Sequence, residues 1–136
     1  MSKPIFSIVA PAINDFLYKD CYDNINWNND IPFEIVFVGD NLPTDTMPSN
    51  FHYIYTKVKP AQCMEIAARE SSGDFIIVTG DDIRYPKNFL KTLNHYLFRV
   101  YSEKFIIAFH ENRYFHRLVF NKRMHDSPII GIAGVY

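Results

Sequence analysis

The stretch Asp74-Phe-Ile-Ile-Val-Thr-Gly-Asp-Asp82 decides the fold class. It begins with a short apolar run, and a run that is apolar throughout is typical of a strand covered on both faces. An acidic turn follows this run directly. The same arrangement occurs at 33–40, where an apolar run ends in Gly39 and Asp40. Strands of this kind belong to parallel sheets, which helices cover on both sides.

Segments with helix-start signals separate the expected strands. The expected helices run from Asn14 or Asp15 to about Trp27, from Pro60 to Ser71 and from Pro86 to about Tyr101, and the expected strands cover 5–10, 33–38, 51–55 and 74–79. Strands that alternate with helices predict an α/β fold with a Rossmann-like, mainly parallel sheet and helices on both faces.

The end of the chain has a different pattern. Apolar runs at 104–109, 114–120 and 129–136 read as strands without long helices between them. A chain of 136 residues has the size of one domain. We therefore expect a single domain over 1–136, with an α/β part over 1–101 and a small, mixed, strand-rich extension over 102–136.

Composition and charge exclude several classes of protein. The chain is 48% hydrophobic with a net charge of −1, which argues against disorder and against binding to nucleic acid through charge. Neither Cys21 nor Cys63 lies in a disulfide or zinc-binding spacing. No apolar run reaches the length of a transmembrane segment, so we expect a cytoplasmic protein.

The pair Asp81-Asp82 is the sharpest chemical signal. Two adjacent carboxylates after a buried strand suit a hard divalent cation, which prefers oxygen ligands and keeps positions open for diphosphate oxygens. The alternative is that these acids cap the helix expected from Pro86, and for an isolated pair capping is the commoner explanation.

Asp40 is a second carboxylate at the end of a buried strand, where it could accept a hydrogen bond from a ligand N–H. An Asx-turn at the start of the following loop is the alternative. Parallel strands bind ligands outside their carboxyl ends. We therefore expect Asp40 and the Asp81-Asp82 pair to lie at one edge of the sheet and to face one cleft.

Four blocks resemble family 2 glycosyltransferases of the GT-A fold, which transfer a sugar from a nucleotide diphosphate. The blocks are Ile5 to Asn14, Phe33 to Asn41, Ala67 to Val78 and Thr79 to Pro86. They are similar, in that order, to the family's opening strand, its second strand, its helix-to-strand junction and its DxD-containing stretch. The resemblance covers about residues 4–100 and implies a metal-assisted glycosyltransferase of nucleotide-diphospho-sugar transferase type.

The resemblance also implies roles for individual residues. The donor-binding residues would be Pro11, Ala12, Asp40, Gly80, Asp81 and Asp82. Asp40 would contact the nucleotide base, and Asp81, with Asp82 beside it, would hold Mn²⁺ or Mg²⁺ on the diphosphate. The donor would be a UDP-sugar more readily than a GDP-sugar. The acceptor would be a carbohydrate, glycolipid or glycoprotein, and self-association is left open.

The chain departs from the family's pattern at four places, one of which is Cys63-Met64-Glu65, where the family usually has Ala-Arg-Asn or Ala-Leu-Asn. Gly39 and Thr79 stand where the family usually has an Asp, and the acceptor region that normally carries the catalytic base is short. Glu111 and Asp126, two of the later acids, are the candidates for the base, although ordinary surface positions explain them as well. The alternative function is a non-catalytic nucleotide-sugar binding module, or a fragment that needs a second chain or domain.

Overall fold

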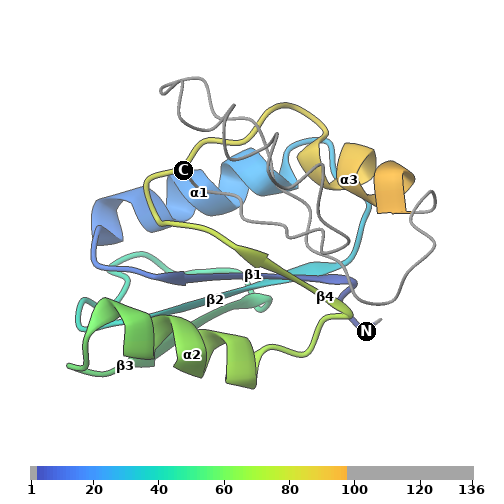
Figure 1. Ribbon diagram of the computed structural model, residues 1–136. Coiled ribbons are helices and arrows are strands. Elements are labelled where there is room, and N and C mark those ends of the chain that lie inside the picture. Colours follow the sequence, from blue (N-terminus) through green and yellow to red (C-terminus); the bar gives the residue numbers. More distant parts are fainter. Residues whose placement is uncertain (1–2, 98–136) are drawn as a thin grey trace, which may run out of the picture.

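The computed structural model describes residues 3–97 and contains alternating strands and helices (Figure 1). The elements are β1 (Phe6–Pro11), α1 (Asp15–Asn26), β2 (Phe33–Gly39), β3 (Phe51–Tyr55), α2 (Pro60–Glu70), β4 (Phe75–Val78) and α3 (Phe89–Leu97). The expected extension over 102–136, with Glu111 and Asp126, lies outside the described residues. Within those residues, the expected order of strands and helices is confirmed.

The strands form one four-stranded parallel sheet in the order β3-β2-β1-β4. The central strand β1 pairs with strands from both sides, because Phe6 is in register with Phe33 of β2 and with Phe75 of β4. The prediction of an α/β fold with a mainly parallel sheet is therefore confirmed for this part of the chain.

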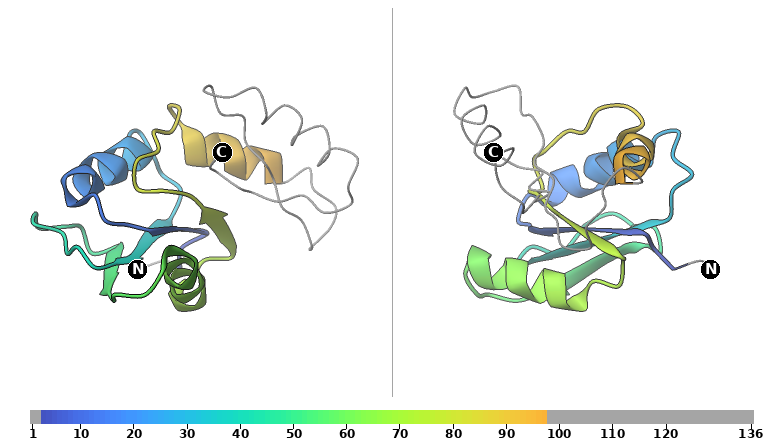
Figure 2. Two further views of the ribbon diagram at one scale, coloured as in Figure 1. Left: turned by 60° about the vertical axis from the view of Figure 1, so that its left-hand side comes forward. Right: turned by 45° about the vertical axis from the view of Figure 1, so that its right-hand side comes forward.

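Helices cover both faces of the sheet (Figures 1 and 2). One face carries α1 and α3 over an aromatic core, in which the rings of Tyr18 and Phe37 lie 5.6 Å apart. The other face carries α2, where Cys63 and Ala67 pack against small strand residues such as Val36. Small side chains on this second face let α2 lie close to the sheet.

The helix expected from Pro86 begins later, at Phe89. The reason is Asn88, whose φ of 60° is left-handed and cannot belong to a helix. The connection before α3 instead packs along α1: Asn24 accepts a hydrogen bond from the backbone N–H of Tyr85 and donates one to its carbonyl, at 2.7 and 3.1 Å. The Tyr85 hydroxyl is hydrogen-bonded to that of Thr79. These contacts fix the segment that carries Asp81 against α1.

A buried carboxylate ties the α2–β4 connection to the sheet near its amino-terminal end. Glu34 accepts hydrogen bonds from the hydroxyl of Ser7 (3.0 Å) and from the backbone N–H of Ser72 (2.7 Å). The N–H of Gly73 donates to the Ser7 hydroxyl, and a Cβ atom at Gly73 would lie only 2.6 Å from that oxygen. The close approach therefore requires glycine at this position.

Within the part of the chain that the structure describes, no helix is long and apolar enough to cross a membrane. Cys21 and Cys63 are both free and buried, in agreement with the expectation that they form no disulfide.

Candidate functional site

The turns that carry the acidic residues meet at the carboxyl-terminal edge of the sheet. Asp40 follows β2 and the Asp81-Asp82 pair follows β4, while β1 lies between these two parallel strands. The expectation that these acids lie at one edge is therefore confirmed. The same edge carries the β1–α1 turn, which follows Pro11.

The carboxylate of Asp81 is buried and holds the β1–α1 turn. Its Oδ2 atom accepts hydrogen bonds from the backbone N–H groups of Ile13 and Asn14, both at 2.8 Å. The side-chain amide of Asn14 donates to Oδ1 at 2.9 Å and lies 3.1 Å from Oδ2. Asp81 thus places negative charge at the start of α1, where a helix favours it. Its hydrogen bonds hold the two residues that precede α1 and do not cap the helix that follows Asp81.

Asp82 has different surroundings, although it is the next residue. Its side chain is exposed, and its carboxylate has no hydrogen bond or ion pair to any other residue in 3–97. A Cβ atom at Gly80 would come 3.1 Å from Asp82 Oδ1, so the glycine leaves room beside this carboxylate. Asp82 is consequently free to meet a ligand.

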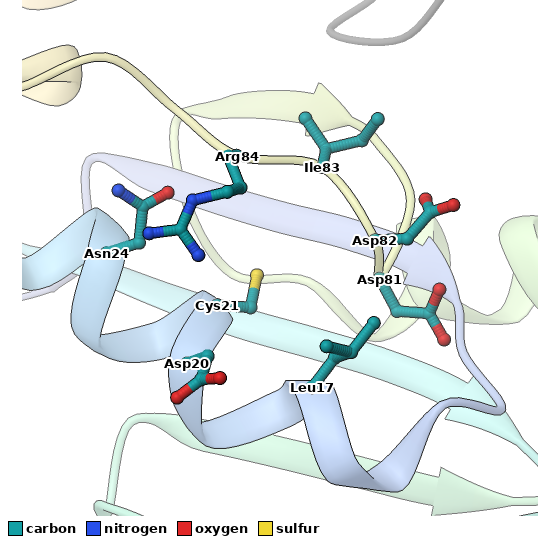
Figure 3. A pocket seen from close by; sticks show the side chains of 8 residues that line it. All are labelled: Leu17, Asp20, Cys21, Asn24, Asp81, Asp82, Ile83 and Arg84. Atoms are coloured by element: carbon teal, nitrogen blue, oxygen red, sulfur yellow. The ribbon is translucent and has the colours of Figure 1, made fainter.

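A small open pocket of ≈ 130 Å³ lies between α1 and the segment after β4. It is lined by Leu17, Asp20, Cys21, Asn24, Asp81, Asp82, Ile83 and Arg84 (Figure 3). In Figure 3 the guanidinium of Arg84 extends back toward α1, which carries Asp20, while Asp81 and Asp82 lie at the other end of the pocket. The pocket therefore joins the acidic turn to a positive charge.

Cys21 lines this pocket but is not a nucleophile. Burial, and to a smaller extent the charge of Asp81, raise the pKa of the Cys21 thiol to about 12. The reactive form of cysteine is the thiolate, which is therefore absent near neutral pH. The thiol serves as an apolar part of the pocket wall.

Hydroxyl and amide groups hold the β1–α1 turn from its other side. The hydroxyl of Tyr53 donates to the carbonyl of Ala12 and accepts from the N–H of Asn41, both at 2.9 Å. The side chain of Asn41 donates to the carbonyl of Ile13 at 2.7 Å, and Tyr18 donates to the carbonyl of Asn41. This network joins the turn after β1 to the turn after β2.

Gly39 explains why the usual Asp is missing at the end of β2. A Cβ atom at this position would lie 2.1 Å from the carbonyl oxygen of Ala12 and 2.9 Å from the Tyr53 hydroxyl. Any side chain there would collide with backbone. The departure from the family's pattern therefore follows from the close approach of the two turns.

Pro11 and Ala12 lie at the end of β1, and neither lines the pocket. The N–H of Ala12 donates to the carbonyl of Val38 at 2.9 Å, and its carbonyl accepts from Tyr53. Both backbone polar groups of Ala12 are thus used within the fold. The next residues along the turn are the ones that reach the surface, and Ile13 is 61% exposed.

Asp40 is exposed, and it does not line the pocket that contains Asp81. Its charge is close enough to α2 to contribute, after burial, to raising the pKa of the Cys63 thiol. The expectation that Asp40 and Asp81 face one cleft is wrong for this pocket, because the Asp81 carboxylate lies under the start of α1 and Asp40 lies near the first turn of α2.

Asn14, Asn41 and Tyr53 hold the turns in place, but in the sequence Asn14 is marked only as a possible helix start, and Asn41 and Tyr53 have no predicted role. Asparagines directly after strands are a signal for such a role, although a turn explains them equally well. Nothing in the alternating pattern of β3 marks the Tyr53 hydroxyl, because its partners are far away in sequence.

A metal ion would need additional ligands at this edge. In the described ranges, no group of three or more His, Cys, Asp and Glu side chains could hold a metal ion by itself. Two adjacent carboxylates are present, and oxygens of a bound diphosphate could complete a coordination sphere around Mg²⁺ or Mn²⁺.

No family model matches the chain, and no curated protein is detectably similar to it in sequence. The interpretation therefore rests on the geometry described above.

Proposed function

We propose that the protein binds a nucleotide-diphospho-sugar at the carboxyl edge of its sheet and acts as a glycosyltransferase of GT-A type. The main support is the position of Asp40 and of the Asp81-Asp82 pair, which the resemblance assigns to the donor. They follow β2 and β4, the strands on either side of β1 in one parallel sheet. Parallel sheets commonly bind their ligands at this edge. The family resemblance itself is an argument by analogy.

The diphosphate would lie beside the turn that carries Asp81 and Asp82. This turn can supply carboxylate oxygen, which suits Mg²⁺ or Mn²⁺ when diphosphate oxygens fill the remaining positions. Such a cation neutralises charge on the departing nucleoside diphosphate when it is bound. Because the described residues contain no complete set of metal ligands, we expect the cation to bind together with the nucleotide.

The nucleotide base would lie between the turns after β1 and β2. The exposed carboxylate of Asp40 can accept a hydrogen bond from the imide N–H of uracil. Ile13 and Leu42, which are 61% and 55% exposed, offer apolar surface to a planar base. This arrangement favours a uridine or guanosine donor over an adenosine donor, because adenine has no ring N–H of this kind.

A transferase must also bring an acceptor hydroxyl to the anomeric carbon, and an inverting enzyme needs a base for its proton. Glu111 and Asp126, the candidates for that base, lie outside the described residues. A binding module without turnover is the second candidate function, because the donor edge is complete without them. Hydrolysis of a UDP-sugar in the absence of acceptor would distinguish an enzyme from a binding module.

Isothermal titration calorimetry with nucleoside diphosphates tests the proposal. We expect UDP to bind at least tenfold more tightly than ADP, because uracil offers a ring N–H to the Asp40 carboxylate and a hydrogen bond to a charged group contributes about 1.5–3 kcal/mol. We also expect UDP to need Mn²⁺ or Mg²⁺ for full affinity. The variant Asp40→Ala should remove the preference for the base and keep the dependence on the cation. If all nucleotides bind equally weakly with and without the cation, the proposed function is wrong.

A further inference from the structure

We infer that the two adjacent aspartates have different tasks: Asp81 is a positioning residue that fixes the β1–α1 turn, and Asp82 is the carboxylate that meets the bound cation and diphosphate. The part that concerns Asp82 rests on the proposed function. The part that concerns Asp81 follows from its hydrogen bonds and can be tested without any ligand.

Hydrogen bonds already occupy most of the acceptor positions of Asp81. A carboxylate offers about four lone-pair sites. The Oδ2 atom of Asp81 accepts from the backbone N–H groups of Ile13 and Asn14, and the Asn14 side chain donates to Oδ1. A cation on Oδ2 would therefore have to displace backbone amides at a residue that is only 7% exposed, and would leave those amides without an acceptor.

Neither burial nor hydrogen bonds within the described residues restrict the carboxylate of Asp82. It is exposed, it lines the pocket together with Arg84, and no hydrogen bond or ion pair within 3–97 holds its carboxylate. In Figure 3 its carboxylate points away from α1, whereas that of Asp81 lies on the side of Leu17. Asp82 can therefore approach a ligand without breaking a hydrogen bond or ion pair among the described residues.

The position of Asp81 gives its hydrogen bonds a function. They connect the turn after β4 to the turn after β1, which Tyr53 and Asn41 connect in turn to the segment after β2. Asp81 thus sets the placement of the diphosphate end of the proposed site relative to its base end. Loss of this connection should loosen the β1–α1 turn rather than remove a cation ligand.

An exchange of charges between Asp81 and Asn14 separates the two explanations. The single variant Asp81→Asn removes the negative charge that accepts from two backbone N–H groups and from the Asn14 amide, so that only weaker, neutral hydrogen bonds remain. The double variant Asn14→Asp/Asp81→Asn restores an amide–carboxylate pair with the charge on the other partner, and an Asp at position 14 also suits the start of a helix. The matched control is Asp23→Asn, on the exposed surface of α1.

We expect Asp81→Asn to lower the melting temperature by about 5 °C, and the double variant to recover at least half of that loss. Asp82→Asn and Asp23→Asn should both melt within about 1 °C of the unmodified protein. In calorimetry with UDP and Mn²⁺, the double variant should bind within about threefold of the unmodified protein, whereas Asp82→Asn should bind at least tenfold more weakly.

Several results would overturn the inference. If the double variant regains its melting temperature but loses the Mn²⁺-dependent affinity, the charge of Asp81 itself serves the cation. If Asp81→Asn melts like the control, Asp81 positions nothing, and if Asp82→Asn binds UDP and Mn²⁺ normally, Asp82 is not the ligand-facing acid. If the unmodified protein binds no nucleotide, the proposed function and the role of Asp82 both fall, while the melting temperatures still decide the role of Asp81.

Discussion

Glu34 and Asp81 are buried to the same degree, at 6% and 7% exposure, but they serve opposite ends of the sheet. Glu34, near the amino-terminal end, binds serine hydroxyls and a backbone N–H from β1 and from the α2–β4 connection. Asp81, at the carboxyl-terminal edge, binds the start of α1. Both carboxylates accept several hydrogen bonds from protein donors, so burial and hydrogen bonding alone do not mark a functional site.

The neighbours of the two carboxylates do differ. Asp81 is followed by an exposed acid, lines a pocket and lies at the edge where parallel sheets bind ligands. Glu34 lies within a strand, and the imidazole of His52 lies 3.8 Å from its carboxylate. A buried carboxylate thus stabilises the fold in either place, and only at the carboxyl-terminal edge does it also position groups that can reach a ligand.

The largest effect is expected for Glu34→Ala. This variant leaves the N–H of Ser72 and the hydroxyl of Ser7 without their buried acceptor. We expect the free energy of unfolding to fall by about 4 kcal/mol, measured by urea denaturation. Nucleotide affinity of the folded protein should not change, because the cluster is at the opposite end of the sheet. A loss of stability below about 1 kcal/mol would show that Glu34 is not the anchor described here.

The next largest loss of stability is expected at Gly39, which we compare with Gly80 at the same carboxyl-terminal edge of the sheet. Gly39→Ala should destabilise the protein by about 3 kcal/mol, because its Cβ would lie 2.1 Å from a backbone carbonyl. Gly80→Ala is the matched control: its Cβ would meet only the flexible side chain of Asp82, at 3.1 Å, so its stability should change by less than about 1 kcal/mol. Equal losses in both variants in chemical denaturation would contradict the close approach of the two turns.

The variant Tyr53→Phe removes a single hydroxyl group from the carboxyl-terminal edge of the sheet. It therefore sharpens the comparison between this edge and the end that carries Glu34. The carbonyl of Ala12 and the N–H of Asn41 each lose a partner, so we expect a loss of about 1.5 kcal/mol in thermal or urea unfolding. Unlike Glu34→Ala, this variant should also weaken the preference for UDP over ADP, because the turn that carries Asp40 is then held to the β1–α1 turn by fewer hydrogen bonds. If the preference for UDP over ADP is unchanged, the hydrogen bonds of Tyr53 do not contribute to nucleotide binding.

The smallest effect concerns alkaline pH. The Cys21 thiol ionises near its ordinary pKa of 9.0 in the unfolded chain and only at about 12 in the folded protein. The unfolded state therefore loses its proton first, and stability should fall as pH rises through this interval, by about 1 kcal/mol between pH 9 and 10. Burial also raises the pKa of Tyr18 and Tyr85 above the ordinary 10.0, so they add to the fall at higher pH. In Cys21→Ala the decline between pH 9 and 10 should be shallower, and an identical slope would remove Cys21 from this explanation.

The sequence predicted the strands and the parallel sheet because short apolar runs and helix-start signals are local features. The start of α3 was wrong by a few residues, because the left-handed backbone of Asn88 is not visible in a hydrophobic pattern. The shared edge of Asp40 and Asp81 followed from the topology. The partners of Asp81 could not be predicted, since Asn14 lies 67 residues away along the chain. For the same reason the partners of Glu34 could not be predicted, and the sequence shows it only as one polar residue in an apolar strand.

The placement of β1 in the middle of the sheet has a consequence for the order in which the chain can fold. The first strand to be synthesised can pair with β2 early, but its other edge is completed only by β4, after residues 75–78 have been made. Until then its free N–H and C=O groups can pair with strands of other chains. Pairings between distant segments also form slowly. The period of greatest risk for aggregation therefore falls during translation, between the synthesis of β2 and that of β4.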